Sequence, residues 1–388
     1  MSQSNANTPA NLTNRRQFLG ALGACLGVGA LGSVGIRRSY AEANSSTLAA
    51  TCHNPAIETR LFASSNVSEQ MARSTLALAR MRCAGFDVKN PEIVSRQYLR
   101  FAGTDAQRAA DLQNIATGAI AAPKLLLGVR GGYGAMRILP KVDWQTLGRI
   151  MQERGTILAG FSDVTAIQCA LLAKGGMSSL AAPMLYSEFG KTQPDTISSQ
   201  EFVSALTDKA LTIDVPALDT NSAPDTLPRI MAKQTRDSIT GILWGGNLSV
   251  VSALAGSDYL PRMDGGMVFL EDVGEQSYRV ERMLYDLYLA GAFKGQQAIV
   301  FGALSGTGED SYDKRFDARA VIEQLHELTG LPIYTGMPFG HVGKKRSFPL
   351  GTQCRLTTDS LGGYQLSFSG YPTLDASQIH PPALWQKA

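Results

Sequence analysis

Two short runs of almost wholly apolar residues constrain the fold of this 388-residue chain more than any other feature. Residues 125–129 have the sequence Leu-Leu-Leu-Gly-Val, and residues 156–161 have the sequence Thr-Ile-Leu-Ala-Gly-Phe, followed directly by a helical pattern over residues 164–174. Strands that are apolar on both faces are typical of a parallel sheet covered by helices on each side. The alternation of strand and helix patterns up to about residue 183 therefore predicts a doubly wound α/β domain.

The remaining patterns predict a second domain after a connecting segment. Residues 190–236 are rich in proline, serine, threonine and aspartate, which is typical of a connection with a single helix at 198–208. We therefore expect domains over residues 44–189 and 237–388. Strands are expected at 61–63, 239–243, 267–270 and 298–302 and as a pair within 350–369. Helices are expected at 68–84, 105–118 with Asp105 as its cap, 248–255, 278–291 and 316–329, with a turn at Gly245-Gly246-Asn247.

Residues 1–43 predict export. Arg15 and Arg16 precede an apolar stretch, residues 18–36, that holds six glycines, and Ala41-Glu42-Ala43 offers a small-x-small cleavage site. This arrangement resembles a twin-arginine export signal and predicts a periplasmic protein, cleaved near Ala43, without a stable membrane anchor. The alternatives are a retained transmembrane helix and lipidation at Cys25.

Composition excludes several classes of protein. A hydrophobic fraction of 44% with 39 glycines is typical of a globular α/β chain. Residues 1–43 hold four of the 36 basic residues and one of the 33 acidic residues, so the rest of the chain is electrically balanced. Such a chain has no electrostatic signature for nucleic acid or for an anionic membrane. The cysteines show no CxxC pair and no metal-ligand spacing, and Cys169 lies in an apolar helical run, as a core residue does.

Histidine is scarce, so a candidate general base is easy to isolate. His53 lies in the segment that precedes the first domain, His380 in the C-terminal tail, and His326 within an amphipathic helical pattern. His341 lies in a glycine-flanked loop after a strand pattern, a position from which reacting side chains are often presented. We interpret His341 as the base, and the alternative is a histidine that only orders its turn.

The candidate nucleophile is Ser162, which lies between the apolar run 156–161 and the helical run 164–174. A strand-to-helix turn raises a side chain above the sheet and places it beside free helix N–H groups. The N–H of Asp163 is therefore a candidate donor to an oxyanion. The surrounding sequence does not match the G-x-S-x-G pattern of ordinary α/β-hydrolases. The alternative is that Ser162 or Asp163 only caps the helix.

A glycine-rich turn and an acidic strand end complete the candidate site. Residues 130–134 have the sequence Arg-Gly-Gly-Tyr-Gly, and consecutive glycines let backbone N–H groups approach a ligand closely. No phosphate-loop pattern is present, and a plain turn is the alternative. Glu271 ends the strand pattern 267–270 and is a candidate to orient a catalytic histidine. A solvated acidic turn is its alternative.

Five motifs occur in one order along the chain. They are R-G-G-Y-G-A-x-R-x-L-P from Arg130, G-F-S-D-x-T from Gly160, G-G-N-L-S from Gly245, F-L-E-D-V-x-E-x-x-Y-x-x-x-R-M-L from Phe269, and G-x-x-x-G-H ending at His341. Together, and with a further match over residues 102–112, they resemble the LD-carboxypeptidases, also called murein tetrapeptide carboxypeptidases. The resemblance covers nearly all of residues 60–357.

The resemblance implies a serine peptidase with Ser162, Glu271 and His341 as its triad, and no metal or cofactor. It places the oxyanion donors at the backbone N–H groups of Asp163 and Gly131. Candidate substrate-binding residues are the other motif members Arg130, Gly132, Tyr133 and Asn247. It also implies a flavodoxin-like N-terminal domain, a smaller β-rich C-terminal domain, a site between them, a homodimer and a cell-wall peptide substrate that loses its terminal D-alanine.

Two departures and two rival functions accompany the resemblance. Ala181-Ala182 stands where the family often has His-Gly, which affects the expected substrate preference. Family members are often cytoplasmic, whereas this chain carries an export pattern. The rival functions are an amidase that cleaves peptide–nucleotide antibiotics and a non-catalytic periplasmic peptide-binding protein. Residues 344–346, Lys-Lys-Arg, are a candidate for binding a substrate carboxylate or else a solvated basic turn.

Overall fold

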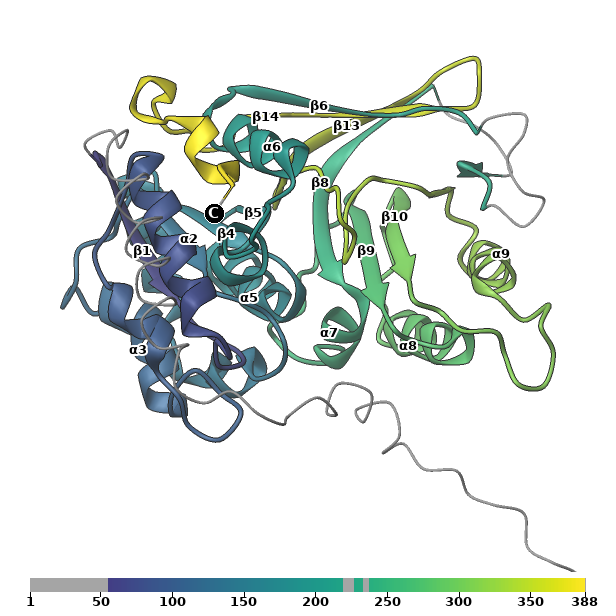
Figure 1. Cartoon of the computed structure of the whole chain (residues 1–388). Helices are drawn as coiled ribbons and strands as arrows, with labels where there is room; N and C mark the ends of the chain where they lie inside the picture. Colours follow the sequence, from purple (N-terminus) through teal and green to yellow (C-terminus); the bar gives the residue numbers. More distant parts are fainter. Residues whose placement is uncertain (1–54, 219–226, 233–236, 388) are drawn as a thin grey trace, which may run out of the picture. The chain divides into compact units, whose positions relative to one another are not determined.

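The structure is a computed structural model that describes residues 55–218, 227–232 and 237–387 (Figure 1). The expected export signal, its cleavage site and Cys25 lie outside the described residues. Within the described residues, no helix has both the length and the apolar character needed to cross a membrane.

The first sheet has six strands in the order β12-β5-β4-β3-β1-β2. Its strands are β1 (Ile57–Phe62), β2 (Phe86–Val88), β3 (Leu125–Gly128), β4 (Ile157–Gly160), β5 (Ser179–Ala181) and β12 (Phe348–Leu350). The first five are parallel, and β3 and β4 are buried along their whole length. The order 2-1-3-4-5 is that of the flavodoxin-like fold, so the doubly wound prediction is confirmed.

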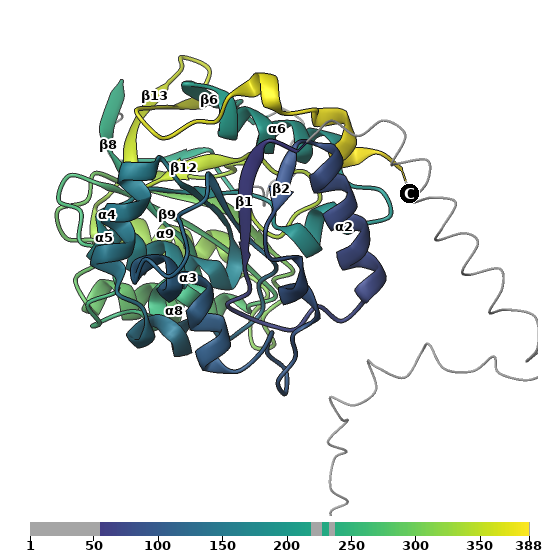
Figure 2. The ribbon, with the colours of Figure 1, turned by 90° about the vertical axis from the view of Figure 1, so that its left-hand side faces the viewer.

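Helices cover this sheet and end at recognisable signals. They are α2 (Met71–Cys83), α3 (Asp105–Ala116), α4 (Trp144–Arg154) and α5 (Thr165–Gly175). Helix α4 contacts both α3 and α5, and Figure 2 shows α2 beside β1 and β2. The expected cap at Asp105 is wrong. Thr104 caps α3 instead, because its hydroxyl accepts from the Gln107 N–H while the Gln107 side chain accepts from the Thr104 N–H.

The second sheet has eight strands in the order β6-β14-β13-β8-β9-β10-β11-β7. Its strands are β6 (Ala210–Val215), β7 (Ile230–Met231), β8 (Ser238–Asn247), β9 (Met267–Val273), β10 (Ala298–Ser305), β11 (Ile333–Tyr334), β13 (Thr352–Thr358) and β14 (Tyr364–Ser369). Strands β8 to β11 are parallel and their flanking strands antiparallel. Helices α7 (Leu248–Ala253), α8 (Ser277–Leu289) and α9 (Ala318–Thr329) lie beside the parallel strands (Figure 1).

Two local expectations for the second half of the chain are wrong. Residues 190–236 hold not only α6 (Thr196–Thr207) but also β6 and β7, because Leu211, Ile213 and Val215 alternate with exposed residues and bury one face of β6. Gly245 and Gly246 do not form a turn. They have positive φ values of 125° and 140° inside β8, and the strand continues to pair Asn247 with Glu271.

Strand β12 and a buried aromatic cluster join the two halves. Strand β12 follows the His341 loop and pairs antiparallel with β5, so that loop is anchored to the sheet that carries Ser162. Phe339 packs edge-on against Phe161, Phe269 and Phe348, with ring centroids 5.0–5.9 Å apart. Phe161, Phe269 and Phe339 lie one or two residues before Ser162, Glu271 and His341, so the cluster brings these three chain segments together.

Candidate active site

The turn that carries Ser162 has a strained backbone. Ser162 follows β4 and opens the short helix η4 (Ser162–Val164), with a φ of +63° that non-glycine residues rarely adopt. Neither Ser162 nor Asp163 caps η4 or α5 through its side chain, so the capping alternative is wrong. The Ser162 hydroxyl instead contacts His341.

Three side chains from separate segments form one hydrogen-bonded series. Ser162 Oγ lies 3.0 Å from His341 Nε2, and His341 Nδ1 lies 2.9 Å from Glu271 Oε2. Glu271 is only 1% exposed, whereas the His341 side chain is 24% exposed. A buried carboxylate accepts from Nδ1–H, which leaves Nε2 to accept the serine proton. This is the arrangement of a nucleophile, a base and an orienting carboxylate.

The close approach of Gly340 and the side-chain amide of Asn247 hold Glu271 in place. A side chain on Gly340, which has a φ of +135°, would place its Cβ 3.0 Å from Glu271 Oε2. The buried Asn247 amide lies 3.3 Å from Glu271 Oε1 and 3.2 Å from Asp272 Oδ1. The Asp272 carboxylate also accepts from the Ser249 and Val273 N–H groups, and burial raises its pKa. Of the two neighbouring carboxylates, only that of Glu271 is bonded to His341.

Comparison with known proteins matches both halves of the chain to one family. Residues 60–182 match the LD-carboxypeptidase N-terminal domain, and residues 240–356 match the LD-carboxypeptidase C-terminal domain. The chain belongs to the LD-carboxypeptidase family. It is thus a hydrolase of the serine carboxypeptidase class.

Individual LD-carboxypeptidases and related structures resemble the chain over most of its length. A Streptomyces coelicolor protein named as a carboxypeptidase is 30% identical over 67% of this chain and 76% of its own length. The murein tetrapeptide carboxypeptidase of Pseudomonas aeruginosa is 27% identical over 71% of this chain and 85% of its own length. The muramoyltetrapeptide carboxypeptidase structure from Oxalobacter formigenes superposes with a TM-score of 0.69 at 28% identity, covering 81% of this chain and 100% of that one. The microcin C7 self-immunity protein shares the fold, with a TM-score of 0.66 at 20% identity over 84% and 99%.

In this LD-carboxypeptidase the glycine-rich turn packs directly on the nucleophile. A Cβ on Gly131 would lie 2.8 Å from both Cβ and Oγ of Ser162 and 3.5 Å from the Asp163 nitrogen. A Cβ on Gly132 would fall within 2.4 Å of the Asn66 side chain. Both positions therefore require glycine for close approach.

The Asp163 carboxylate ties the glycine-rich turn to the nucleophile. Its Oδ2 accepts from the Ser65 hydroxyl at 2.6 Å and from the Ala135 N–H at 2.9 Å. Burial raises the pKa of this carboxyl, and the hydrogen bonds and the charges of Arg108 and Arg100 oppose that rise. The sequence predicts a role only for the Asp163 N–H and not for this carboxylate. The one feature of the sequence that pointed to Asp163 is that it directly follows the candidate nucleophile Ser162.

The other candidate residues lie around this centre. Arg130 donates to the Val67 carbonyl and lies over the Tyr186 ring, and Tyr133 is half exposed. Two of the three basic residues at 344–346 are already paired. Lys345 is buried with its Nζ 2.9 Å from Glu188, and Arg346 bonds Glu201. Only Lys344 of the three is exposed, so the alternative of a fully solvated basic turn is wrong.

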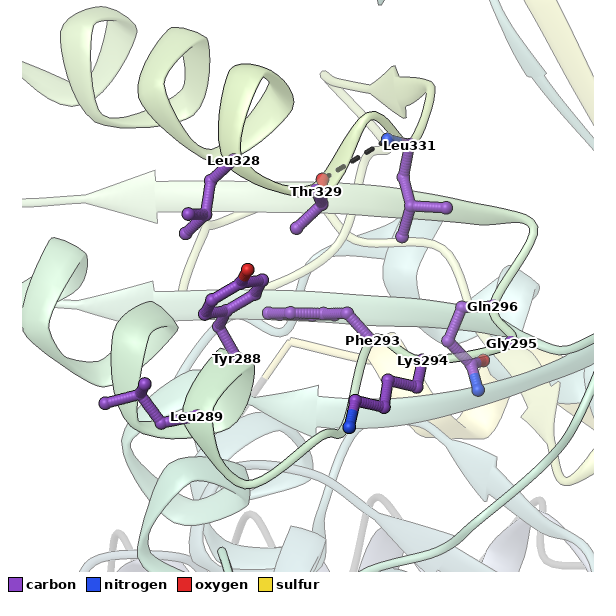
Figure 3. Close-up of a pocket in the computed structure, with 9 residues that line it drawn as sticks. All are labelled: Tyr288, Leu289, Phe293, Lys294, Gly295, Gln296, Leu328, Thr329 and Leu331. Carbon is purple, nitrogen blue, oxygen red and sulfur yellow. Dashed lines mark hydrogen bonds between the residues drawn. The ribbon is translucent and has the colours of Figure 1, made fainter.

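A separate cavity of about 530 Å³ lies between the ends of α8 and α9 (Figure 3). Its lining includes Tyr288, Leu289, Phe293, Gln296 and Leu331. Gln296 and Leu331 precede β10 and β11, so the cavity lies at the amino ends of these parallel strands. Glu271 lies near the carboxyl end of the neighbouring strand β9, at the opposite edge of the sheet. The cavity is therefore distinct from the candidate active site.

Proposed function

We propose that this LD-carboxypeptidase removes the terminal D-alanine from murein tetrapeptides by serine catalysis. The observation that carries the proposal is the hydrogen-bonded series from Ser162 through His341 to Glu271. The names of the relatives from Pseudomonas aeruginosa and Oxalobacter formigenes support the choice of substrate.

The reaction follows from the order of the three side chains. Ser162 Oγ attacks the scissile carbonyl carbon while His341 Nε2 takes its proton. The tetrahedral intermediate collapses as His341 returns the proton to the leaving amine, which releases D-alanine and leaves an ester on Ser162. Water, deprotonated by His341, then attacks the ester carbonyl, and His341 returns that proton to the departing Ser162 oxygen as the shortened peptide leaves with a free carboxylate. Glu271 remains a carboxylate and stabilises the imidazolium throughout.

We assign the oxyanion donors to the backbone N–H groups of Asp163 and Gly131. The contact between Gly131 and the Ser162 side chain supports this assignment, because an oxyanion donor must lie near the attacking oxygen. The Asn247 amide is occupied by Glu271 and Asp272, so we assign Asn247 to positioning Glu271 instead of contacting substrate.

Ser162→Ala tests this proposal. Incubation of the wild-type protein with murein tetrapeptide should produce a peptide lighter by one alanine residue in mass analysis. The variant should lose about 10⁴-fold or more in kcat, since it lacks the nucleophile, while substrate binding changes little. A wild-type protein that releases no D-alanine, or a variant that keeps its turnover, would refute the proposal.

The same assay separates the rival functions. A peptide–nucleotide amidase would turn over a peptidyl nucleotide faster than the tetrapeptide. The microcin self-immunity neighbours share the fold at 20% identity, while the more similar relatives bear carboxypeptidase names. A peptide-binding protein would bind the tetrapeptide without cleavage and would leave Ser162 unlabelled by a serine-reactive phosphonate.

We further propose that the protein acts in the periplasm, after export through the twin-arginine pathway, and as a homodimer. Arg15 and Arg16 support export, and Cys83 is disulfide-bonded, which fits an oxidising compartment. Replacing both arginines with lysine should retain the protein in the cytoplasm, as cell fractionation would show. Light scattering of the purified protein would test the dimer.

A further inference from the structure

A tight hairpin borders the nucleophile on the side of the glycine-rich turn. Tyr98 and Phe101 exchange two backbone hydrogen bonds of 2.9 Å, which leaves Leu99 and Arg100 as a two-residue tip. Leu99 has a φ of +53° and is 72% exposed. Such a backbone conformation in a non-glycine residue persists only where the surrounding structure holds it.

Backbone and ring contacts fix this hairpin beside the active site. The Ala102 N–H donates to the Ser65 carbonyl, and the Val67 N–H donates to the Arg100 carbonyl. Ser65 in turn donates its hydroxyl to Asp163, the residue after the nucleophile. The Phe101 ring lies 6.0 Å from that of Tyr133, and a Cβ on Gly134 would lie 2.8 Å from it. The hairpin therefore extends the surface that holds Ser162.

Arg100 projects from this hairpin without a carboxylate partner among the described residues. Its Nε lies 3.4 Å from Asn66 Oδ1, an oxygen that also accepts from the Tyr133 N–H at 3.2 Å, and its guanidinium lies 5.6 Å from the centroid of the Tyr133 ring. The neighbouring Arg137 and Arg108 both pair with Asp105. Arg100 keeps its other guanidinium N–H groups available, next to the turn that contacts the nucleophile.

A carboxypeptidase substrate brings a negative charge close to the nucleophile. Its substrate ends in a free carboxylate one residue beyond the scissile bond, and a chain extends by about 3.5 Å per residue. Among the other cations near the described site, Lys345 and Arg346 are paired with glutamates, and Arg130 lies within 3.5 Å of Glu69. Arginine binds carboxylates through two parallel hydrogen bonds, and the exposed rings of Tyr98 and Tyr133 offer apolar surface for the peptide.

We propose that Arg100, presented by the strained hairpin 98–101, binds a carboxylate of the peptide substrate. The inference rests on the proposed carboxypeptidase function and names a residue that recognises its substrate. Two carboxylates of a tetrapeptide that contains diaminopimelate lie close to the scissile bond. One is the terminal carboxylate of D-alanine, and the other is on the side chain of diaminopimelate.

The test compares Arg100→Gln with the wild-type protein on three peptides. They are the parent tetrapeptide, its C-terminal carboxamide, and the tetrapeptide with lysine in place of diaminopimelate. On the parent peptide the variant should lose about 10- to 100-fold in kcat/KM, mostly through KM, because a charge-assisted pair is removed. On the peptide that lacks the recognised carboxylate, the kcat/KM values of the variant and the wild-type protein should agree within about threefold. That peptide identifies which carboxylate Arg100 binds.

Three further variants make the result specific. Arg100→Lys keeps the charge and should recover part of the loss. Arg137→Gln removes a similar arginine that already pairs with Asp105 and should change kcat/KM less than twofold. Lys344→Gln tests the rival exposed cation near His341.

Results of two kinds overturn the inference. One is an equal loss for Arg100→Gln on all three peptides, or no loss on any. The other is a carboxylate-dependent loss for Lys344→Gln without one for Arg100→Gln. If the wild-type protein released no D-alanine from the parent peptide, the proposed function itself would fail first, so the two failures are distinguishable.

Discussion

In the half of the site that comes from the first sheet, the backbone holds the reacting group, whereas in the half from the second sheet side chains do so. Ser162 lies in a turn where its own φ is positive, and the backbone of Gly131 packs against it. Neither Glu271 nor His341 has a positive φ. They are fixed by hydrogen bonds to each other, by the Asn247 amide, and by the room that Gly340 leaves for the carboxylate.

This difference teaches where each half is vulnerable. Where the backbone holds the nucleophile, no atom can be added to the glycine that packs against it, because a Cβ at that position could fit only if the strained turn moved. A base held by side chains tolerates small changes of shape and depends instead on the chemical identity of each partner, because one lost acceptor alters the tautomer. Substitutions in the two halves should therefore fail in different ways.

After loss of the nucleophile itself, Glu271→Gln should have the largest effect and act on chemistry alone. Glutamine has the shape of glutamate, so the buried site should keep its packing and the protein its stability. The amide no longer favours the Nδ1–H tautomer of His341 and cannot stabilise the imidazolium, so kcat should fall by about 10⁴-fold. Steady-state kinetics on murein tetrapeptide measure this fall.

Asp272→Asn is the matched control for Glu271→Gln, since the Asp272 carboxylate is buried next door but is not bonded to His341. It should lose less than about tenfold. Equal losses in the two variants would show that Glu271 acts only through packing.

Gly131→Ala should have the next largest effect and act on geometry. The new methyl group would lie 2.8 Å from Ser162 Oγ, so the turn or the nucleophile must move. We expect a fall of about 10²- to 10³-fold in kcat, the effect of losing one oxyanion donor. Labelling by a serine-reactive phosphonate should slow as well. Gly308→Ala is the control, because a Cβ there meets nothing within 4 Å, and unchanged activity in Gly131→Ala would contradict the assignment.

Sequence patterns could predict the parts of this molecule that follow from local chemistry. The apolar runs of β3 and β4 predict buried parallel strands, and their order with the helices predicts the doubly wound sheet. Ser162, Glu271 and His341 could each be named because each follows a strand pattern and because only four histidines compete for the role of base. Strand β6 could also have been found, since Leu211, Ile213 and Val215 alternate, but proline and serine around it concealed the pattern.

Other features depend on contacts between distant residues and could not be predicted. The positive φ of Ser162 is set by the packing of its neighbours, and any residue type can follow a strand. The antiparallel pairing of β12 with β5 joins residues 348–350 to 179–181. The carboxylate role of Asp163 depends on Ser65, which precedes it by 98 positions.

Asp163→Asn should have the smallest effect on activity and a measurable one on stability. Asparagine Oδ1 can still accept from Ser65 and Ala135, so kcat should fall by at most about tenfold. Burial raises the pKa of Asp163, so the folded protein binds this proton more tightly than the unfolded chain does. The resulting stabilisation is complete below the ordinary carboxyl pKa of about 4 and is lost as pH rises through the raised pKa.

Asparagine is neutral at every pH and removes this loss. Urea unfolding at several pH values should therefore show the free energy of unfolding falling less steeply from acid to neutral pH in Asp163→Asn than in the wild-type protein. Asp163→Ala deletes the acceptor of both hydrogen bonds, frees the glycine-rich turn, and should approach the activity loss of Gly131→Ala. If Asp163→Asn lost as much activity as Asp163→Ala, the negative charge and not the hydrogen bonds would hold the turn. The part of the site that carries Ser162 would then depend on the chemical identity of a side chain, as the part that carries Glu271 and His341 does.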